Sequence, residues 1–328
     1  MKALLLAAGR GKRLRPITHT TPKYLIPLGP TTLLDRHIKN IMELGINEVG
    51  IVVHHLSELV VGHVKQKWRQ INVQFITQES PLGTGNAVST GKEFIGDSDF
   101  LLIYADNLFS EKAYEKIINH YSREGKPIIG TTEVVDPWNY GVCLTEKNNL
   151  VSIIEKPPSE RYGNKVLTGI FVLNKSIWDY LNMVRLSPRG EYELTDAINI
   201  MSKEHSILCV DVGRPWIDVG RPNSLLKANR IILEELGIKV YIDKSVKLAT
   251  GKIYDATICE NVEVGQDSTI ENSIIMDSTK IGKKVHIKHA IIGCRCLLGD
   301  NSTLIGKIDD PLVIGADTRL PANTRIIA

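Results

Sequence analysis

The spacing of apolar residues over the first two-thirds of the chain alternates between two patterns. Short apolar runs predict buried strands over residues 1–8, 48–54, 73–77 and 100–105. Apolar residues at helical spacing predict helices over residues 33–44, 59–68, 113–121 and 224–236. This alternation is typical of an α/β fold, in which helices on both faces cover a mainly parallel sheet. Ligands of such sheets bind beyond the carboxyl ends of the strands, so the residues that follow Ala8 and Ala105 are candidates.

The last quarter of the chain has a different period. Branched apolar residues recur in steps of five or six, with one step of ten, at Ile258, Val264, Ile270, Ile275, Ile281, Ile287, Ile292, Leu298, Leu304, Ile314, Leu320 and Ile326. Hexapeptide periodicity predicts very short strands that each bury one branched side chain inside a parallel β-helix. The step of ten contains residues 307–311 and indicates an inserted loop. We therefore expect two domains, residues 1–238 and 239–328.

Composition and charge narrow the class of protein. The chain has 328 residues, of which 43% are hydrophobic, and its formal net charge is only +3. A dedicated nucleic-acid binder would need a concentrated basic surface, and this near balance argues against one. No apolar run approaches the roughly 18 residues of a membrane span. The five cysteines form no C-x-x-C pair, which fits reduced thiols, so we expect a cytoplasmic protein with no membrane partner.

A glycine-containing turn follows the first predicted strand. Gly9 and Gly11 would let backbone N–H groups approach a polyphosphate, and cationic residues at positions 10, 12, 13, 15 and 23 surround them. An ordinary strand–helix turn with a solvated basic rim is the alternative. The turn is not a Walker loop, because Gly-x4-Gly-Lys-Ser/Thr is absent. It is not a dinucleotide fingerprint either, because Leu14 occupies the third glycine position, which disfavours a hydride-transferring enzyme.

The whole segment Gly9-x-Gly11-x-Arg13-Leu14-x-Pro16, followed by Pro22-Lys23, resembles the signature of the sugar-1-phosphate nucleotidyltransferases, or NDP-sugar pyrophosphorylases. Further segments resemble that family in order, beginning at Gln78, Pro81, Tyr104, Tyr140, Glu155, Thr168, Glu191 and Trp216. The resemblance covers nearly all of residues 1–236. It implies a Rossmann-like α/β fold of the nucleotide-diphospho-sugar transferase type. Longer members of the family carry a C-terminal left-handed β-helix.

The resemblance also implies the reaction, in which a sugar-1-phosphate oxygen attacks the α-phosphorus of a nucleoside triphosphate and expels pyrophosphate in line. Positioning and charge neutralisation dominate such a transfer. Asp106 and Asp218 both follow apolar strands and are candidate ligands for Mg²⁺, which prefers oxygen donors. Surface or capping roles for these two aspartates are the alternative.

Site residues follow from the same resemblance. It implies that Arg13 holds the β- and γ-phosphates, that Lys23 stabilises charge near the α-phosphate, and that Lys156 binds the sugar-linked phosphate. The implied nucleotide-binding residues are Ala7, Ala8, Gly9, Gly11, Gln78, Pro81, Gly83 and Thr84. The implied sugar-phosphate residues are Asp106, Tyr140, Gly141, Glu155, Lys156, Thr168, Gly169 and Glu191.

The choice of base depends on Gln78, which stands where uridylyl- and thymidylyl-transferring relatives carry a base-contacting glutamine. A carboxamide offers a donor and an acceptor, which suits the N3–H and adjacent carbonyl of a pyrimidine. Residues 189–196 and 166–169 resemble the thymidylyltransferase pattern, so we expect dTTP or UTP with glucose-1-phosphate. Guanine presents a similar edge, and residues 81–84 and 104–108 also resemble guanylyltransferases, so GTP with mannose-1-phosphate is the alternative.

Two further alternatives concern the whole chain and its tail. A non-catalytic relative would have lost phosphate-handling residues, but Arg13, Lys23, Asp106, Lys156 and Asp218 are all present. The tail could serve assembly, acyl transfer or allosteric control. His286 and His289 keep acyl transfer open, although roughly four to five coils of about 18 residues are few for a coenzyme A site. Edge strands at the last coil favour pairing between subunits, which predicts a homo-oligomer.

Overall fold

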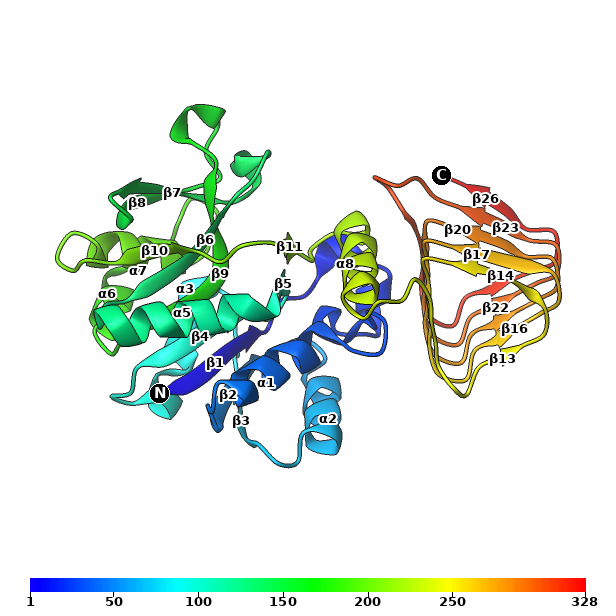
Figure 1. The fold of residues 1–328 in the computed structure, drawn as a ribbon, viewed down its shortest axis with the longest axis horizontal. Helices are drawn as coiled ribbons and strands as arrows, with labels where there is room; N and C mark the ends of the chain where they lie inside the picture. Colours follow the sequence, from blue (N-terminus) through cyan, green and yellow to red (C-terminus); the bar gives the residue numbers. More distant parts are fainter. The chain divides into compact units, whose positions relative to one another are not determined.

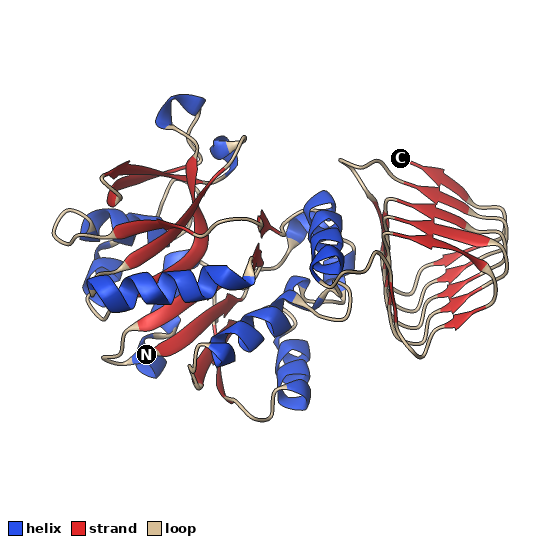
Figure 2. Cartoon of the chain, in the orientation of Figure 1, coloured by secondary structure: helices blue, strands red, loops and turns tan.

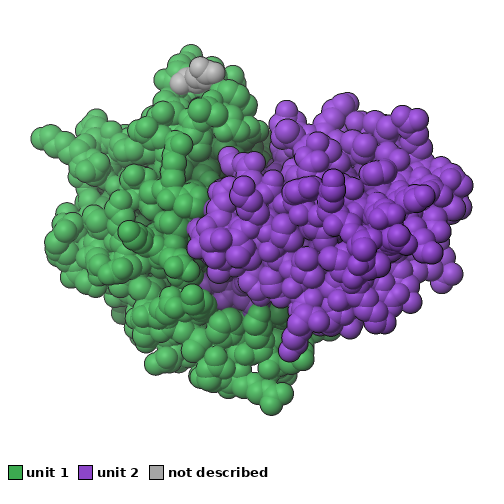
Figure 3. Space-filling model, turned by 45° about the vertical axis from the view of Figure 1, so that its right-hand side comes forward, with its two compact units in different colours: residues 1–9, 37–216 green, residues 10–36, 217–328 purple. Residues whose placement is uncertain are grey.

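The computed structural model describes residues 1–159 and 161–328. The chain forms two compact units, which Figure 3 shows in two colours. The first unit contains Met1–Gly9 and His37–Trp216, and the second contains Arg10–Arg36 and Ile217–Ala328. The segment after the first strand, including most of the glycine-containing turn, thus clusters with the C-terminal part of the chain. The expected domain boundary after residue 238 stays a prediction.

The first unit is built on a nine-stranded sheet with the order β3-β2-β1-β4-β9-β6-β10-β8-β7 (Figure 1). Its strands are β1 (Lys2–Ala7), β2 (Glu48–Val53), β3 (Asn72–Thr77), β4 (Phe100–Tyr104), β6 (Ile128–Glu133), β7 (Gly141–Glu146), β8 (Asn149–Glu155), β9 (Lys165–Leu173) and β10 (Leu208–Asp211). This unit also contains the short strand β5 (Asn107–Phe109), and the short strand β11 (Trp216–Asp218) begins at its last residue. Strands β3, β2, β1 and β4 are parallel, as the strand–helix alternation predicts.

The other half of this sheet is mostly antiparallel. Strand β9 runs antiparallel to β4 and β6, and β7 and β8 form a hairpin. The hairpin turn consists of Lys147 and Asn148, both with positive φ (48° and 68°), which is the geometry of a two-residue turn. Such a turn replaces the helical crossover that parallel strands require. The α/β class is therefore confirmed, with a sheet that is parallel in one half and mixed in the other.

The helices are α1 (Leu33–Glu43), α2 (Ser57–Lys67), α3 (Thr84–Thr90), α4 (Lys92–Ile95), α5 (Glu111–Glu124), α6 (Ile177–Met183), α7 (Leu194–Met201) and α8 (Pro222–Glu235). The four predicted helices correspond to α1, α2, α5 and α8. On one face of the sheet, Leu4, Leu6 and Leu102 share a buried cluster with residues of α3, α4, α6 and α7. Phe100 stacks on Trp178 there, with ring centroids 5.4 Å apart. Helix α5 contacts β6 and β9 (Figure 2).

The second unit contains a parallel β-helix of three five-stranded sheets. The first sheet consists of β12 (Tyr241–Ile242), β15 (Thr257–Ile258), β18 (Ile274–Ile275), β21 (Ala290–Ile292) and β24 (Leu312–Ile314). The second consists of β13 (Lys247–Leu248), β16 (Glu263–Val264), β19 (Lys280–Ile281), β22 (Leu297–Leu298) and β25 (Arg319–Leu320). The third consists of β14 (Gly251–Tyr254), β17 (Ser268–Glu271), β20 (His286–Lys288), β23 (Thr303–Ile305) and β26 (Arg325–Ile327).

The interior of the β-helix is the predicted column of branched residues. The residues from Ile258 to Ile314 in the hexapeptide series lie in one buried cluster, against which Leu320 and Ile326 pack. Thr257 pairs with Ile274 and Ile274 with Ile291, so neighbouring coils stack in parallel register. Residues 307–311 connect β23 to β24, as the step of ten predicts. Among the described residues, no helix is long and apolar enough to cross a membrane.

Candidate active site

The glycine-containing turn has a backbone shape that its own residues fix. Gly11 has φ +60°, and a Cβ atom there would lie 2.8 Å from Cγ2 of Thr18. The Thr18 hydroxyl donates a hydrogen bond to the Gly11 carbonyl at 2.8 Å. Leu14 is buried in the 3₁₀ turn Lys12–Leu14, while Ala7 and Ala8 are buried at the end of β1 and Gly9 is exposed. A side chain at position 11 would therefore be strained by both its φ and its neighbours.

The cationic residues of this turn face solvent. Arg10, Lys12, Arg13 and Arg15 are exposed, and Lys23 is half-buried with its Nζ 5.4 Å from the centre of the Tyr24 ring. Nη2 of Arg13 lies 3.9 Å from Oδ2 of Asp218. A Cβ atom at Gly220 would overlap the Arg13 guanidinium, so glycine makes room for it. The second unit thus brings together Arg13 and Asp218, two predicted phosphate and metal residues.

Asp106 lies in the first unit, in the two-residue connection between β4 and β5. Its carboxylate is half-buried, and Nδ2 of Asn107 donates a hydrogen bond to its Oδ1 at 3.4 Å. In the described chain, the buried Oδ1 of Asn107 has no hydrogen-bond partner. An unsatisfied buried oxygen beside a carboxylate fits a site that receives a cation with its waters. The described residues contain no cluster of three or more His, Cys, Asp or Glu placed to hold a metal, and Mg²⁺ is normally bound by one or two carboxylates together with substrate phosphates.

Gln78 follows β3 and is almost completely buried. Its Nε2 donates to Oδ1 of Asn86 at 2.7 Å and to the Gly83 carbonyl at 3.4 Å. Both amide hydrogens are thereby used within the protein. The carboxamide oxygen is then the atom that can accept a hydrogen bond from a base.

The turn at residues 81–85 is bound to the segment before α7. Gly83 has φ +107°, and a Cβ atom there would lie 2.6 Å from the Tyr192 carbonyl oxygen. The Gly85 N–H donates to that same oxygen at 2.8 Å, and the Leu194 N–H donates to Oγ1 of Thr84 at 3.0 Å. Burial raises the pKa of Tyr104, and its hydrogen bond with Thr84 opposes this rise. Three predicted motifs therefore meet at Thr84, while Pro81 is exposed.

The sugar-phosphate candidates form a continuous chain of contacts within the first unit. The Lys156 N–H donates to the Tyr140 carbonyl at 2.9 Å, and the Tyr140 ring packs edge-on against Trp216 at 5.2 Å. Nε1 of Trp216 donates to the Thr168 carbonyl at 2.9 Å. A Cβ atom at Gly169 would lie 2.9 Å from Nδ2 of Asn107, next to Asp106. Lys156, whose φ is +46°, is exposed.

Arg189 joins three carboxylates in the same unit and has no place among the predicted site residues. Its guanidinium lies 3.0 Å from Glu155, 3.4 Å from Glu191 and 3.5 Å from Glu193. Burial opposes protonation of Arg189, but the three carboxylates raise its pKa. Burial raises the pKa of Glu193, against the lowering effect of Arg189. Gly141 lies beside this cluster, since a Cβ atom there would be 3.1 Å from Oε2 of Glu155.

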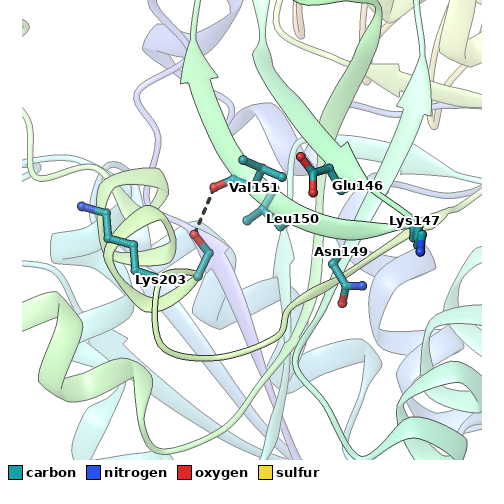
Figure 4. Close-up of a pocket in the computed structure, with 7 residues that line it drawn as sticks. Glu146, Lys147, Asn149, Leu150, Val151 and Lys203 are labelled. Carbon is teal, nitrogen blue, oxygen red and sulfur yellow. Dashed lines mark hydrogen bonds between the residues drawn. The ribbon is translucent and has the colours of Figure 1, made fainter.

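Two other features lie apart from the predicted residues. A surface hollow beside the β7–β8 hairpin is lined by Glu146, Lys147, Asn149, Leu150, Val151, Ser202 and Lys203 (Figure 4). None of these lining residues is a predicted site residue. On the β-helix, His286 is exposed, and Nδ1 of His289 lies 2.8 Å from Nδ2 of Asn272.

Comparisons with known proteins identify the chain's relatives. The sequence model of the nucleotidyl transferase family matches residues 2–235, and that of the GMPPB C-terminal domain matches residues 236–327. The bifunctional protein GlmU of Methanocaldococcus jannaschii is 30% identical, over 92% of this chain and 80% of the relative. The bifunctional sugar-1-phosphate nucleotidylyltransferase/acetyltransferase of Sulfurisphaera tokodaii is 32% identical, over 99% of this chain and 82% of the relative.

A solved structure shares the fold. The UDP-glucose pyrophosphorylase from Acinetobacter baumanii has a TM-score of 0.62 and 23% identity, and the likeness covers 71% of this chain and 93% of that one. The family model thus covers most of the chain, and the relatives are similar to it along nearly its whole length. This chain belongs to the nucleotidyl transferase family and is a sugar-1-phosphate nucleotidyltransferase.

Proposed function

We propose that the protein transfers a nucleotidyl group from dTTP or UTP to glucose-1-phosphate, with Mg²⁺, and releases pyrophosphate. The observation that carries this proposal is the chain of contacts that joins Lys156, Tyr140 and Thr168 to the surroundings of Asp106. A phosphate-binding cation and a metal-binding carboxylate are thereby held on one framework.

Three cationic residues are proposed to bind the phosphate groups. Arg13, beside Asp218, would hold the β- and γ-phosphates and the departing pyrophosphate, because a guanidinium can bind two oxygens of a phosphate at once. Lys23 would act near the α-phosphate. Lys156 would hold the phosphate of the attacking sugar, which keeps the nucleophilic oxygen oriented toward the α-phosphorus.

Mg²⁺ would be held by Asp106 and Asp218, whose oxygen donors suit it. When bound, it would neutralise the charge of the phosphates. Asn107 orients the Asp106 carboxylate through its side-chain amide, so the position of this ligand depends on a buried neighbour.

The base preference is proposed from Gln78. With its amide donors directed to Asn86 and Gly83, its carboxamide oxygen can accept the N3–H of thymine or uracil. Adenine and cytosine carry no hydrogen at the corresponding ring nitrogen, so a base held in the same position would not pair with this oxygen through its ring. Guanine does carry one, so GTP remains the second candidate.

The experiment is a comparison of pyrophosphate release from glucose-1-phosphate with dTTP, UTP, GTP, CTP and ATP, each with and without Mg²⁺. Mg²⁺-dependent release with dTTP or UTP is the expected result. Release with GTP alone would overturn the base assignment, and mannose-1-phosphate would then replace glucose-1-phosphate in the assay. No release with any nucleotide would mean that glucose-1-phosphate is not the sugar substrate or that the chain is a non-catalytic relative.

The homo-oligomer stays a prediction. The first coil of the β-helix exposes Ile242, Leu248 and Tyr254 on the edge strands of its three sheets. Unpaired edges of this kind favour pairing with another copy of the chain. Sedimentation equilibrium of the full chain measures the subunit number directly, and a monomer at every concentration would refute the prediction.

A further inference from the structure

The three walls of the β-helix differ in what they present outward. Side chains alternate along a strand, so the neighbours of the interior residues point away from the axis. On the second sheet these neighbours include Lys247, Glu263 and Lys280, which form ion pairs of 3.1 and 3.5 Å. The third sheet presents Glu271 and Lys288, paired at 2.8 Å. Both walls are therefore polar and solvated.

The first sheet has the opposite character. Its outward residues Thr257, Ile274 and Ile291 are completely buried, although their neighbours Ile258, Ile275 and Ile292 already fill the interior of the β-helix. A wall that is buried on both sides must be covered by another part of the chain. Contacts within the second unit show that α8 and the segment Arg10–Arg36 lie against it.

One hydroxyl joins three parts of this unit. The Gly29 N–H donates to Oγ1 of Thr257 at 3.1 Å and to Oδ1 of Asn229 at 3.0 Å. The Thr257 hydroxyl donates to Oδ1 of Asn229 at 2.6 Å. Asn229 belongs to α8, Thr257 to the second coil, and Gly29 to the tight turn in which Leu28 and Thr31 exchange hydrogen bonds of 2.8 and 3.3 Å. All three groups are buried, so each depends on the others for its hydrogen bonds.

A second contact joins the last coil to the same segment. A Cβ atom at Gly315 would lie 3.1 Å from Cβ and Cγ of Pro16, whereas at the other β-helix glycines it would meet atoms of the β-helix itself. Lys23 lies between Pro16 and Gly29 in the sequence, and a Cβ atom at Gly11 would lie 3.4 Å from its Cβ, so the start of the segment also contacts this middle part. The segment is thus held near both of its ends.

We propose that the β-helix positions the glycine-containing turn for nucleotide binding, and that Thr257 and Asn229 act as positioning residues through Gly29. This inference rests on the proposed role of the turn in holding the triphosphate. Neither side chain is proposed to touch substrate. Loss of the Thr257 hydroxyl would loosen the Gly29 turn, and with it Lys23 and Gly11, because a buried donor would lose one of its acceptors.

The test compares Thr257→Val with Thr279→Val in the full chain. Thr279 is equally buried in the β-helix, and its hydroxyl likewise donates to a carbonyl (Gly293, 2.8 Å) and accepts from an N–H (Cys296, 3.1 Å). Both variants lose the same kind of hydroxyl, but of these two threonines only Thr257 contacts the segment Arg10–Arg36, through Gly29. The readouts are the KM values for dTTP and for glucose-1-phosphate, and hydrogen–deuterium exchange of peptides that cover residues 10–32 without ligand.

The expected result is a rise of about tenfold in the KM for dTTP in Thr257→Val, with the KM for glucose-1-phosphate unchanged. Exchange over residues 10–32 should be faster in this variant alone, and Thr257→Ser should restore both properties. Equal effects in the two valine variants, or unchanged exchange in Thr257→Val, would overturn the proposal. If the wild-type chain does not turn over dTTP, the proposed substrate fails, but the exchange comparison still decides whether Thr257 holds the turn.

Discussion

The two units that carry candidate residues hold them in different ways. In the first unit, Gln78, Thr84 and Tyr140 are fixed by contacts between side chains and backbone that run from one motif to the next. In the second unit, Arg10, Lys12, Arg13 and Arg15 are exposed, and the segment that carries them is bound to α8 and the β-helix at Gly29. Base and sugar recognition is thus expected to depend on individual side chains, and triphosphate binding on the placement of a backbone segment.

The largest effect is expected at Asp106, on which the metal site depends. Asp106→Asn keeps the size of the side chain but removes the charge that attracts Mg²⁺, so kcat should fall by about a thousandfold. Asp97→Asn, in an exposed carboxylate paired with Lys175, is the matched control and should leave kcat unchanged. Pyrophosphate release and thermal unfolding measure activity and fold together. Turnover like that of wild type in Asp106→Asn would remove this residue from the metal site.

The second-largest effect is expected in the second unit, where Arg13 is proposed to bind the triphosphate. Arg13→Ala should lower kcat/KM for the nucleotide by about a hundredfold, because it removes a charged hydrogen-bonding partner of the triphosphate. Lys12→Ala, one residue earlier on the same exposed rim, removes the same charge and should have a much smaller effect. Equal losses in the two variants would mean that the turn acts only through its general positive charge.

A smaller effect is expected at Lys156 in the first unit. Lys156→Ala should raise the KM for glucose-1-phosphate by about tenfold, and the KM for the nucleotide by much less. Lys147→Ala is the matched control, since this lysine is also exposed and has a similar φ (48° against 46°). A change confined to the KM for the nucleotide would place Lys156 with the triphosphate instead.

The smallest effect concerns pH and the carboxylates around Arg189. Burial raises the pKa of Glu193 in the folded state above that of the unfolded chain. The folded state then binds more protons near this pKa, so the contribution of Glu193 to stability is lost as pH rises through it. Glu193→Gln should flatten this part of the pH dependence of the free energy of unfolding, measured by urea denaturation. The change should be less than about 1 kcal/mol, because Arg189 partly compensates for the burial of Glu193. Identical pH profiles for the two proteins would contradict this assignment.

Local patterns and long-range contacts differ in how far the sequence predicts them. The hexapeptide period predicts the β-helix because each coil repeats the same short-range packing, and Ile258 to Ile314 occupy the expected interior. The family motifs predict which residues lie near Thr84 and Asp106. The hydrogen bond between Gly29 and Thr257 joins residues 228 positions apart and leaves no periodic signal in either segment. Arg189 was missed in part for a similar reason: Glu191 and Glu193 are close to it in sequence, but Glu155 is 34 residues away and meets it only in the folded chain.

Product identification by phosphorus NMR shows directly whether the protein transfers a nucleotidyl group to the sugar phosphate. The full chain is incubated with Mg²⁺, glucose-1-phosphate and dTTP or UTP, with Asp106→Asn as the inactive control. The expected products are equal amounts of pyrophosphate and of a new diphosphate diester, formed only when Mg²⁺ and the wild-type chain are present. Orthophosphate or a nucleoside diphosphate in place of these two products, or the same products with Asp106→Asn, would contradict this expectation.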